Sequence, residues 1–290
     1  MTKRKPKSQR AKQLSLRPET FRRLVGMTPG NFFEICERIR PTYLKAEEKR
    51  LCKIQAKTER ILGLAIDGQY KLSLEDRVLM LLMYYRLYVT HVFLGFLFGI
   101  SESNVCRNMN AVQPLLAKFF RIPERKVDVN EEKILAMFLD GTEQSINRPG
   151  GKEQKKWYSG KKKRHTIKHQ IIASKSGKIL AVGKSSYGKV HDKKDYERQH
   201  FIFPQNVPRL ADLGYKGTIW QTPIKRPKAG VLSEEEHLFN RKLSKDRIII
   251  EHVIGKMKIF KILAERFRNS RKKHMMIFKN IAGIYNMTFV

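Results

Sequence analysis

An apolar run that ends in an aspartate constrains this chain more than any other feature of its sequence. Residues 134–139 are six consecutive apolar residues, and Asp140 and Gly141 follow them directly. An unbroken apolar run of this length predicts a strand that is buried on both faces. A carboxylate at the end of such a strand is costly to desolvate unless something pairs with it. We therefore expect the chain to fold around a buried strand that ends in a charged site.

Two further acids repeat this pattern. Asp212 follows Leu210 and Ala211, which predicts another strand that ends in an acid, and Glu251 lies in the helix-like segment 247–258. Three carboxylates that converge repel one another, and divalent cations are the usual remedy. Beside a polyanion, two such cations suggest phosphodiester chemistry. For each acid alone, the alternative is a plain turn or a solvated helix residue.

The net charge indicates the class of partner. The chain has 290 residues, with 60 Lys and Arg against 27 Asp and Glu, which gives a formal charge of +33. Such an excess predicts nucleic acid as the partner, and the competing interpretation is a membrane surface. The length suits one large domain or two ordinary ones, and 41% apolar residues suffice for a core.

The remaining composition narrows the setting. Cys36, Cys52 and Cys106 are widely spaced without a CxxC pair, which argues against a zinc site or a disulfide framework and fits a reducing compartment. No signal peptide pattern follows the basic N-terminus. The most apolar window, residues 81–100, contains Arg86 and His91, so we interpret it as core helices and expect no membrane span.

The N-terminal part predicts a helical domain over residues 21–122. Residues 1–20 are predicted to form a basic disordered tail that can touch DNA phosphates. Thr28 and Pro29 are typical of a helix start, and Pro41 is predicted to end that helix.

A helix-turn-helix is predicted over about residues 74–113. Ser73, Thr90 and Ser101 are candidate N-caps of successive helices, and Gly99 provides the turn. In the last helix Val105, Met109 and Val112 recur at helical spacing and should face inward. Four polar residues are left outside as candidate DNA contacts: Ser103, Asn104, Arg107 and Asn108. The alternative is a generic helical bundle. Pro114 is predicted to bend or restart the helix.

The C-terminal part predicts a mixed α/β domain over residues 131–290. Strands at residues 166–173 and 179–183 with short turns indicate an antiparallel meander that includes the Asp140 strand. The next strand should end at Asp212. A helix is predicted to begin at Ser233 and another at Ser244, and the second carries Arg247, Glu251 and Lys258 near one line.

A run of four cations precedes the second strand. Lysines beside glycine and tyrosine suit a hairpin laid along a sugar-phosphate backbone, and the alternative is a solvated turn. The candidate DNA contacts here are Lys161, Lys162, Lys163 and Arg164.

Several of these segments together resemble the DDE-superfamily transposases of bacterial insertion sequences, in the branch related to eukaryotic Harbinger elements. The likeness extends from about residue 74 to the C-terminus, and its N-terminal part is similar to the helix-turn-helix domain of that family. The segments that carry it are 139–143, 158–162, 165–168, 191–192, 212–217 and 240–241 with 247–258.

The resemblance implies a fold and a site. The fold is an RNase H-like mixed sheet with helices on both sides, preceded by the all-α helix-turn-helix domain. Asp140, Asp212 and Glu251 are implied as the acid triad that holds two Mg²⁺ or Mn²⁺ ions, which lie roughly 3.5–4 Å apart in such sites. Arg247 and Lys258 are candidate DNA contacts. His165, His191 and Asp192 are candidate auxiliary residues that orient phosphate or metal ligands.

The leading hypothesis is therefore a transposase that binds element ends and cuts and joins double-stranded DNA. It would act as a homo-oligomer on DNA in a bacterial cytoplasm, associated with the nucleoid. One alternative is a catalytically silent or domesticated DNA-binding protein of the same family. The other is a nuclease that cuts without integrating.

Overall fold

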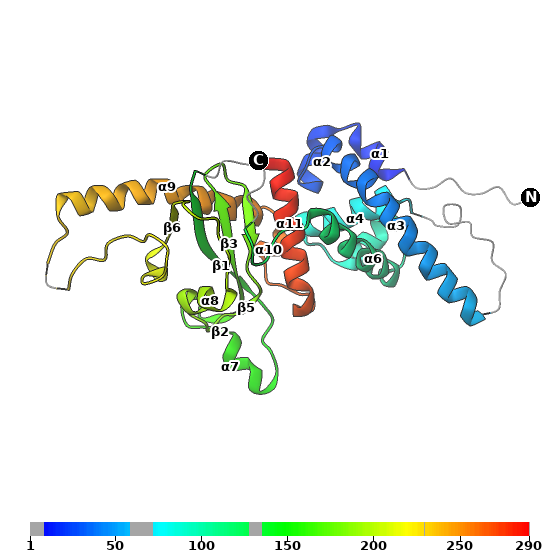
Figure 1. Ribbon diagram of the computed structural model, residues 1–290. Coiled ribbons are helices and arrows are strands. Elements are labelled where there is room, and N and C mark those ends of the chain that lie inside the picture. Colours follow the sequence, from blue (N-terminus) through cyan, green and yellow to red (C-terminus); the bar gives the residue numbers. More distant parts are fainter. Residues whose placement is uncertain (1–8, 59–71, 128–134, 229, 290) are drawn as a thin grey trace, which may run out of the picture. The chain divides into compact units, whose positions relative to one another are not determined.

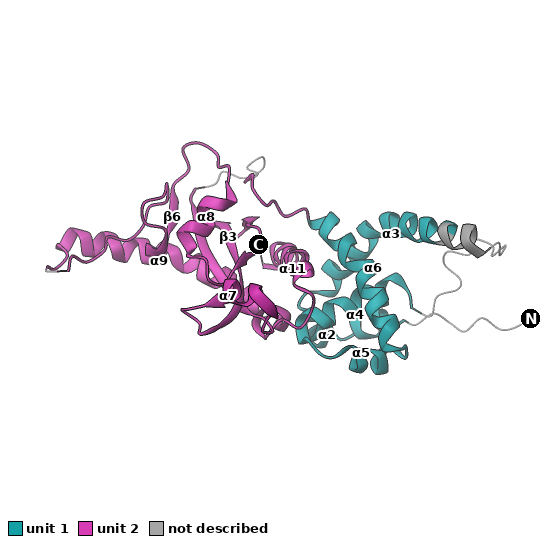
Figure 2. Cartoon of the chain, turned by 90° about the horizontal axis from the view of Figure 1, so that it is seen from below, with its two compact units in different colours: residues 1–120 teal, residues 121–290 magenta. Residues whose placement is uncertain are grey.

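The computed structural model describes residues 9–58, 72–127, 135–228 and 230–289. The chain divides into two compact units, Met1–Phe120 and Arg121–Val290, shown in different colours in Figure 2. Each unit is described by itself. None of the described helices is both long enough and apolar enough to cross a membrane.

The regular elements in the described part of unit 1 are all helices (Figure 1). Its elements are α1 (Arg10–Ser15), α2 (Pro18–Val25), α3 (Pro29–Thr58), α4 (Leu74–Leu87), α5 (His91–Phe98) and α6 (Glu102–Phe120).

Two predictions for the start of this unit are wrong. The predicted disordered tail, residues 1–20, contains α1 and part of α2 from residue 10 onward, and residues 1–8 lie outside the described residues. The backbone N–H of Ala11 donates to Asp76 Oδ1 at 2.9 Å, and Phe21 is fully buried, so tertiary contacts hold these helices. Pro41 does not end its helix, because α3 continues through it with Ile39 and Tyr43 buried on either side.

The predicted helix-turn-helix is confirmed as α4, α5 and α6. Thr90 Oγ1 accepts from the Phe93 N–H at 3.2 Å, and Ser101 Oγ accepts from the Asn104 N–H at 3.4 Å. The α5–α6 turn is tight, since a Cβ at Gly95 would lie 2.7 Å from the carbonyl oxygen of Ile100. Val105, Met109 and Val112 are buried as predicted, and α6 runs through Pro114 as one helix.

Unit 2 is built on a mixed sheet with the order β2-β3-β1-β6, and β4 and β5 also pair with β3. The strands are β1 (Met137–Ser145), β2 (Tyr158–Ser159), β3 (Arg164–Ser174), β4 (Ile179–Val182), β5 (Ser186–Tyr187) and β6 (Arg209–Ala211). β1 runs antiparallel to β3 and parallel to β6. The predicted mixed sheet flanked by helices is confirmed.

The strand that carries Asp140 differs from its prediction. β1 begins at Met137 and continues to Ser145, so Asp140 lies within the strand and not at its end. Leu135 is 63% exposed, and Ile134 lies outside the described residues. The strand continues because each residue from Met137 to Ser145 has a partner on β3.

Helices and short turns cover the two faces of this sheet. They are η1 (Gly151–Glu153), α7 (Gln154–Trp157), α8 (Asp192–Gln199), η2 (Leu213–Tyr215), α9 (Glu234–Lys258), α10 (Lys261–Ala264), η3 (Arg271–Lys273) and α11 (His274–Phe289). Ser244 is not an N-cap, because α9 begins after Ser233 and runs unbroken through residue 244. Ser233 and Glu236 form a reciprocal capping box that starts α9 eleven residues earlier than predicted for the Glu251 helix.

Successive residues of β1 point to opposite faces. Met137 and Leu139 belong to a core cluster with Tyr215 and Trp220, beside which Tyr196 of α8 packs. Asp140 and Gln144 point to the other face, against which α9 and α11 lie. Asp140 and Gly141 therefore occupy positions on opposite faces of the sheet.

A buried chain of hydrogen bonds fastens α11 to the sheet. His274 Nδ1 lies 2.8 Å from His169 Nε2, and His274 Nε2 lies 2.7 Å from Gln144 Oε1. Gln144 Nε2 donates to the carbonyl oxygens of Ile262 and Glu265 at 2.6 and 2.7 Å. At the other end, His169 Nδ1 lies 3.1 Å from the Gly183 carbonyl oxygen.

Candidate active site

Asp140 lies half-buried in the middle of β1, on the face that α9 covers. Its Oδ1 accepts from the Gly141 N–H at 2.7 Å. The pKa of Asp140 is raised to about 6, mainly by burial and to a smaller extent by the charges of Asp212 and Asp192, against the opposing effects of the Gly141 N–H and of Arg247. The charged form of this carboxyl group is therefore costly at this position unless a cation compensates it.

The other two predicted acids are Asp212, directly after β6, and Glu251 on α9. Arg247 of α9 lies between them, with Nη1 3.5 Å from Asp212 Oδ1 and Nη2 4.0 Å from Glu251 Oε1. The Arg247 side chain is 12% exposed, whereas those of Asp212 and Glu251 are 52% and 60% exposed. One largely buried guanidinium thus joins the second and third acids of the predicted triad.

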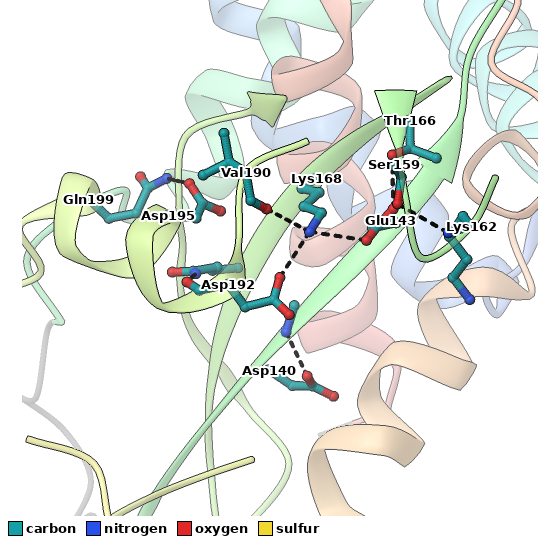
Figure 3. Close-up of polar contacts among 12 residues, drawn as sticks. Asp140, Glu143, Ser159, Lys162, Thr166, Lys168, Val190, Asp192, Asp195 and Gln199 are labelled. Atoms are coloured by element: carbon teal, nitrogen blue, oxygen red, sulfur yellow. Dashed lines mark hydrogen bonds and ion pairs between the residues drawn. The ribbon is translucent and has the colours of Figure 1, made fainter. Parts of the chain in front are cut away.

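A second group of charges lies on the opposite face of β1 (Figure 3). Lys168 Nζ lies 3.1 Å from Glu143 Oε1 and 3.1 Å from Asp192 Oδ1, and it donates to the Val190 carbonyl oxygen at 2.8 Å. Glu143 and Lys168 are direct cross-strand partners in the β1–β3 register. The two carboxylates hold the pKa of Lys168 above its ordinary value in spite of burial, so the ammonium group stays charged.

Asp192 lies close to both groups, because it packs against the backbone at Gly141 and Gly214. A Cβ at Gly141 would lie 3.6 Å from Asp192 Oδ1, and one at Gly214 would lie 3.8 Å from Asp192 Oδ2. The Tyr215 hydroxyl is close to the same point, 3.4 Å from a Gly141 Cβ, and it is buried without a hydrogen-bond partner in the described part of the chain. Burial and the surrounding acids raise the pKa of Tyr215.

Cations also border the acids. Burial lowers the pKa of Lys258, and Lys162 lowers it further, while Asp140 and Glu143 act in the opposite direction. Lys258 of α9 and Lys162 of the β2–β3 turn are therefore neighbours at the edge of the site. Lys161, Lys162, Lys163 and Arg164 are all exposed, and the predicted hairpin exists as the antiparallel β2–β3 pair.

The candidate auxiliary residues do not all lie here. Asp192 is at the site, and its neighbour His191 is exposed at the N-terminus of α8. His165 pairs with Tyr158, and its carbonyl oxygen accepts from the Ile146 N–H, at the end of β1 away from Asp140. Its partner Ile146 is six residues from Asp140 along the chain, or about 20 Å at the usual strand rise.

The candidate DNA contacts of unit 1 lie on α6. Ser103, Asn104 and Arg107 are exposed, and Arg107 Nη1 donates to Asn104 Oδ1 at 2.9 Å. Asn108 is only half-exposed, and its amide donates to the Asn104 carbonyl oxygen at 2.7 Å. Three of the four side chains are thus presented outward as predicted.

The acids suit divalent cations in their chemistry. Carboxylate oxygens are the ligands that Mg²⁺ and Mn²⁺ prefer. Among the residues that the structure describes, no three acidic, histidine or cysteine side chains are gathered closely enough to hold one ion together. Arg247 lies between two of the acids instead. Burial raises the pKa of Asp140, so a cation bound beside it would stabilise its charged form, and the oxygen donors are chemically suited to the predicted metal.

Sequence reasoning missed Lys168 and Glu143. A signal for them exists in β3, where Thr166, Lys168 and Gln170 occupy alternate positions and are all buried. A lysine on the buried polar face of a strand requires a carboxylate partner.

The comparisons with known proteins identify the family. The DDE superfamily endonuclease family matches residues 139–286, and the family of the helix-turn-helix of DDE superfamily endonuclease matches residues 70–121. The chain is 34% identical over 291 residues to a protein of Microchaete diplosiphon named "Probable transposase for insertion sequence element IS702", with 97% of each chain covered.

A second relative comes from Streptomyces albus G and is named "Putative transposase for insertion sequence element IS112". It is 30% identical over 224 residues, which cover 75% of this chain and 81% of the relative. No solved structure matches the chain significantly. The matched ranges include the three acids, the ion group around Lys168 and the α4–α6 helices, and the chain belongs to the DDE superfamily of insertion-sequence transposases.

Proposed function

We propose that this transposase binds the ends of an insertion element through unit 1 and cuts and joins DNA at the acids of unit 2. One observation carries the proposal: Arg247, whose guanidinium lies 3.5 Å from Asp212 and 4.0 Å from Glu251, also acts electrostatically on Asp140, so one cation relates three acids that are 72 and 39 residues apart along the chain. The positive net charge of +33 supports DNA as the partner.

Asp140, Asp212 and Glu251 would hold two Mg²⁺ or Mn²⁺ ions. Bound there, the ions would activate a water or a DNA 3′-hydroxyl for in-line attack and stabilise the leaving oxygen. Asp140 is suited to the central position, because it is the most buried of the three acids and is flanked by Asp212 and Asp192.

The cationic side chains would hold the DNA. Arg247 and Lys258 border the acids, and their charges suit the phosphate that reacts. Lys161, Lys162, Lys163 and Arg164 extend the positive surface from Lys258 along the β2–β3 turn. Phosphate contacts of this kind position the DNA without reading its sequence.

Lys168 would act indirectly. Its contacts to Glu143 and Asp192 fix Asp192 beside Gly141 and Gly214, the glycines next to the first two acids. Asp192 is therefore a positioning residue, which supports the backbone that presents Asp140 and Asp212. Sequence recognition is assigned to Ser103, Asn104, Arg107 and Asn108 of α6.

The test is a cleavage and strand-transfer assay with the purified chain, labelled duplexes that carry the flanking element ends, a target plasmid and Mg²⁺. We expect cut ends and joined products from the wild type, and neither from Asp140→Asn. A wild type that binds the ends but leaves them intact would instead support the silent DNA-binding protein. Cleavage without joined products would support the nuclease.

A further inference from the structure

A second positively charged site lies at the other end of β1, outside the acid site. It is a cleft of about 420 Å³ between the segment after β1 and the segment before η3. We call it the flank cleft and define it by Asn147, Arg148, Phe267, Asn269, Arg271 and Lys272. Neither the acids nor the predicted basic turn contributes to its lining.

The floor of the flank cleft is fixed to the sheet. Phe267 and Ile146 form a parallel bridge, and both side chains are buried. The Phe267 N–H donates to the Ser145 carbonyl oxygen at 2.8 Å, and the Ile146 N–H donates to the His165 carbonyl oxygen at 2.9 Å. The two walls are therefore held at a set separation by backbone hydrogen bonds.

Two of its three cations are also held in place. The Arg271 guanidinium carbon lies 4.9 Å from the centre of the Trp157 ring, and Trp157 packs edge-on against Tyr187. When its amide oxygen faces Arg148, Gln154 accepts from the Arg148 guanidinium at 2.9 and 3.0 Å. An ordered arginine loses less side-chain entropy when it binds a ligand than a free one does.

The chemistry of the lining indicates an anionic ligand. Arg148, Arg271 and Lys272 provide three positive charges, Asn147 and Asn269 provide amide donors, and the lining contains no acid. Arginines present paired N–H donors that match phosphate oxygens.

The distance of the cleft from Asp140 suits a DNA phosphate as the anionic ligand. Ile146 directly follows β1 and is six residues beyond Asp140, which is about 20 Å at the usual strand rise per residue. Duplex DNA advances about 3.4 Å per base pair, so 20 Å corresponds to about six base pairs. A duplex with one phosphate at the acids can therefore place a second phosphate group at the cleft.

We propose that the flank cleft is a second DNA-backbone site, which binds the duplex about six base pairs from the phosphodiester at the acids. This inference rests on the proposed function, because it takes DNA as the ligand of unit 2. Contacts at both the acids and the flank cleft would fix the angle at which the DNA crosses the sheet. A single contact at the acids would leave this angle free.

The test compares two triple variants of the full-length protein in buffer without divalent cations, so that DNA binds without being cut. One is Arg148→Ala/Arg271→Ala/Lys272→Ala, and the matched control is Lys175→Ala/Lys184→Ala/Lys225→Ala, which removes three exposed charges elsewhere on unit 2. Affinity for an element-end duplex is measured at several salt concentrations. We expect the slope of log affinity against log salt to flatten by about 0.9 for each phosphate that the protein no longer neutralises, in the cleft variant only.

A second measurement locates the phosphate group that the cleft binds. Single uncharged methylphosphonates are moved along the duplex, and the wild type should lose affinity when one lies about six base pairs from the site of cleavage. The cleft variant should be insensitive at that position and remain sensitive near the acids. Circular dichroism and thermal unfolding check that both variants fold, and Arg148→Lys/Arg271→Lys, which keeps the charge, should recover most of the salt slope.

The outcomes separate this inference from the proposed function. Equal salt slopes for the cleft variant, the control and the wild type would overturn the assignment of the flank cleft as a DNA-backbone site, even if the wild type cuts element ends. A wild type that cuts nothing, together with a flatter salt slope for the cleft variant, would retain the cleft as a DNA site and refute the catalytic proposal.

Discussion

Unit 1 and unit 2 assemble their functional side chains in different ways. In unit 1 the candidate DNA contacts come from one continuous helix, α6, within six residues of one another. In unit 2 the three candidate acids come from β1, the residue after β6 and α9, and their relative positions depend on the parallel pairing of β1 with β6 and on the packing of α9 against both strands.

This difference determines what each site requires. A helix presents its outward residues once it is capped and its apolar side is buried, so the surface of unit 1 depends on local interactions. The acids of unit 2 repel one another, and their arrangement needs buried cations and long-range pairing. Substitutions should therefore have graded effects on unit 1 and severe effects on unit 2.

The largest expected effect follows removal of one acid. Asp140→Asn, Asp212→Asn and Glu251→Gln should each reduce cleavage more than about 100-fold, since residues that only support metal ligands already cost 10–100-fold. DNA binding should survive, because unit 1 is unchanged. Glu234→Gln, an exposed acid at the start of the same helix as Glu251, serves as the control. Near-normal cleavage by a triad variant with Mg²⁺ removes that residue from the site.

The second-largest expected effect is on the free energy of unfolding and follows removal of the buried cation Lys168. Lys168→Met leaves Glu143, which is 11% exposed, without its cation, and should lower the free energy of unfolding by about 3 kcal/mol. The contrasting variant in unit 1 is Arg38→Met, which breaks the exposed Arg38–Glu34 pair and should cost less than about 0.5 kcal/mol. Urea unfolding of both variants tests the comparison. Similar losses would mean that the ion group around Lys168 is solvated.

A smaller effect is expected on sequence preference. Arg107→Ala should reduce the preference for element ends over random duplex by about tenfold, the usual worth of one base contact. Its binding to random duplex should change little. Lys118→Ala, an exposed cation near the end of α6, is the control. If both variants keep the full preference in a competition assay, recognition does not run through the first turns of α6.

The smallest effect compares two N-caps. Thr90→Ala removes the cap of α5 within the helix-turn-helix and should destabilise unit 1 by about 1 kcal/mol. Ser233→Ala removes the capping box of α9, whose buried residues begin only at Leu243, so fraying there should remain local. Hydrogen exchange resolves the two cases. Global destabilisation by the second variant would show that the start of α9 is part of the core.

The local features of the fold could be predicted from the sequence. Ser73, Thr90 and Ser101 were identifiable as N-caps because a hydroxyl side chain at a helix start accepts a hydrogen bond from a free backbone N–H of the first turn. This interaction is local, so its prediction requires no tertiary information. The errors occurred where another interaction, tertiary in one case and local in the other, overrode the signal on which the prediction was based. Pro41 lacks one N–H group, but buried Ile39 and Tyr43 keep α3 continuous, and Ser244 lies in a helix that a stronger cap had already started.

The candidate site divides in the same way. Asp140, Asp212 and Glu251 are identified as candidates by their local settings and by the family resemblance, and they stay a prediction. The parallel pairing of β1 with β6, the central position of Arg247 and the ion group around Lys168 could not. They depend on which strands become neighbours, and periodicity within a segment carries no information on that.

The hydrogen-bond chain through His169 and His274 that fastens α11 determines how many protons the two rings must carry. The chain begins at the Gly183 carbonyl oxygen and ends at Gln144 Oε1, whose orientation is fixed because its amide group donates elsewhere. Three contacts through two imidazole rings need three protons, and two neutral rings supply two.

Burial keeps the third proton out at neutral pH, since it lowers the pKa of His169 to about 4 and that of His274 well below its ordinary value. Both rings bind protons more readily in the unfolded chain, where a histidine pKa is about 6.5. The free energy of unfolding should therefore fall as the pH drops from about 6.5 towards 4. The join between α11 and the sheet is where acid would first loosen unit 2.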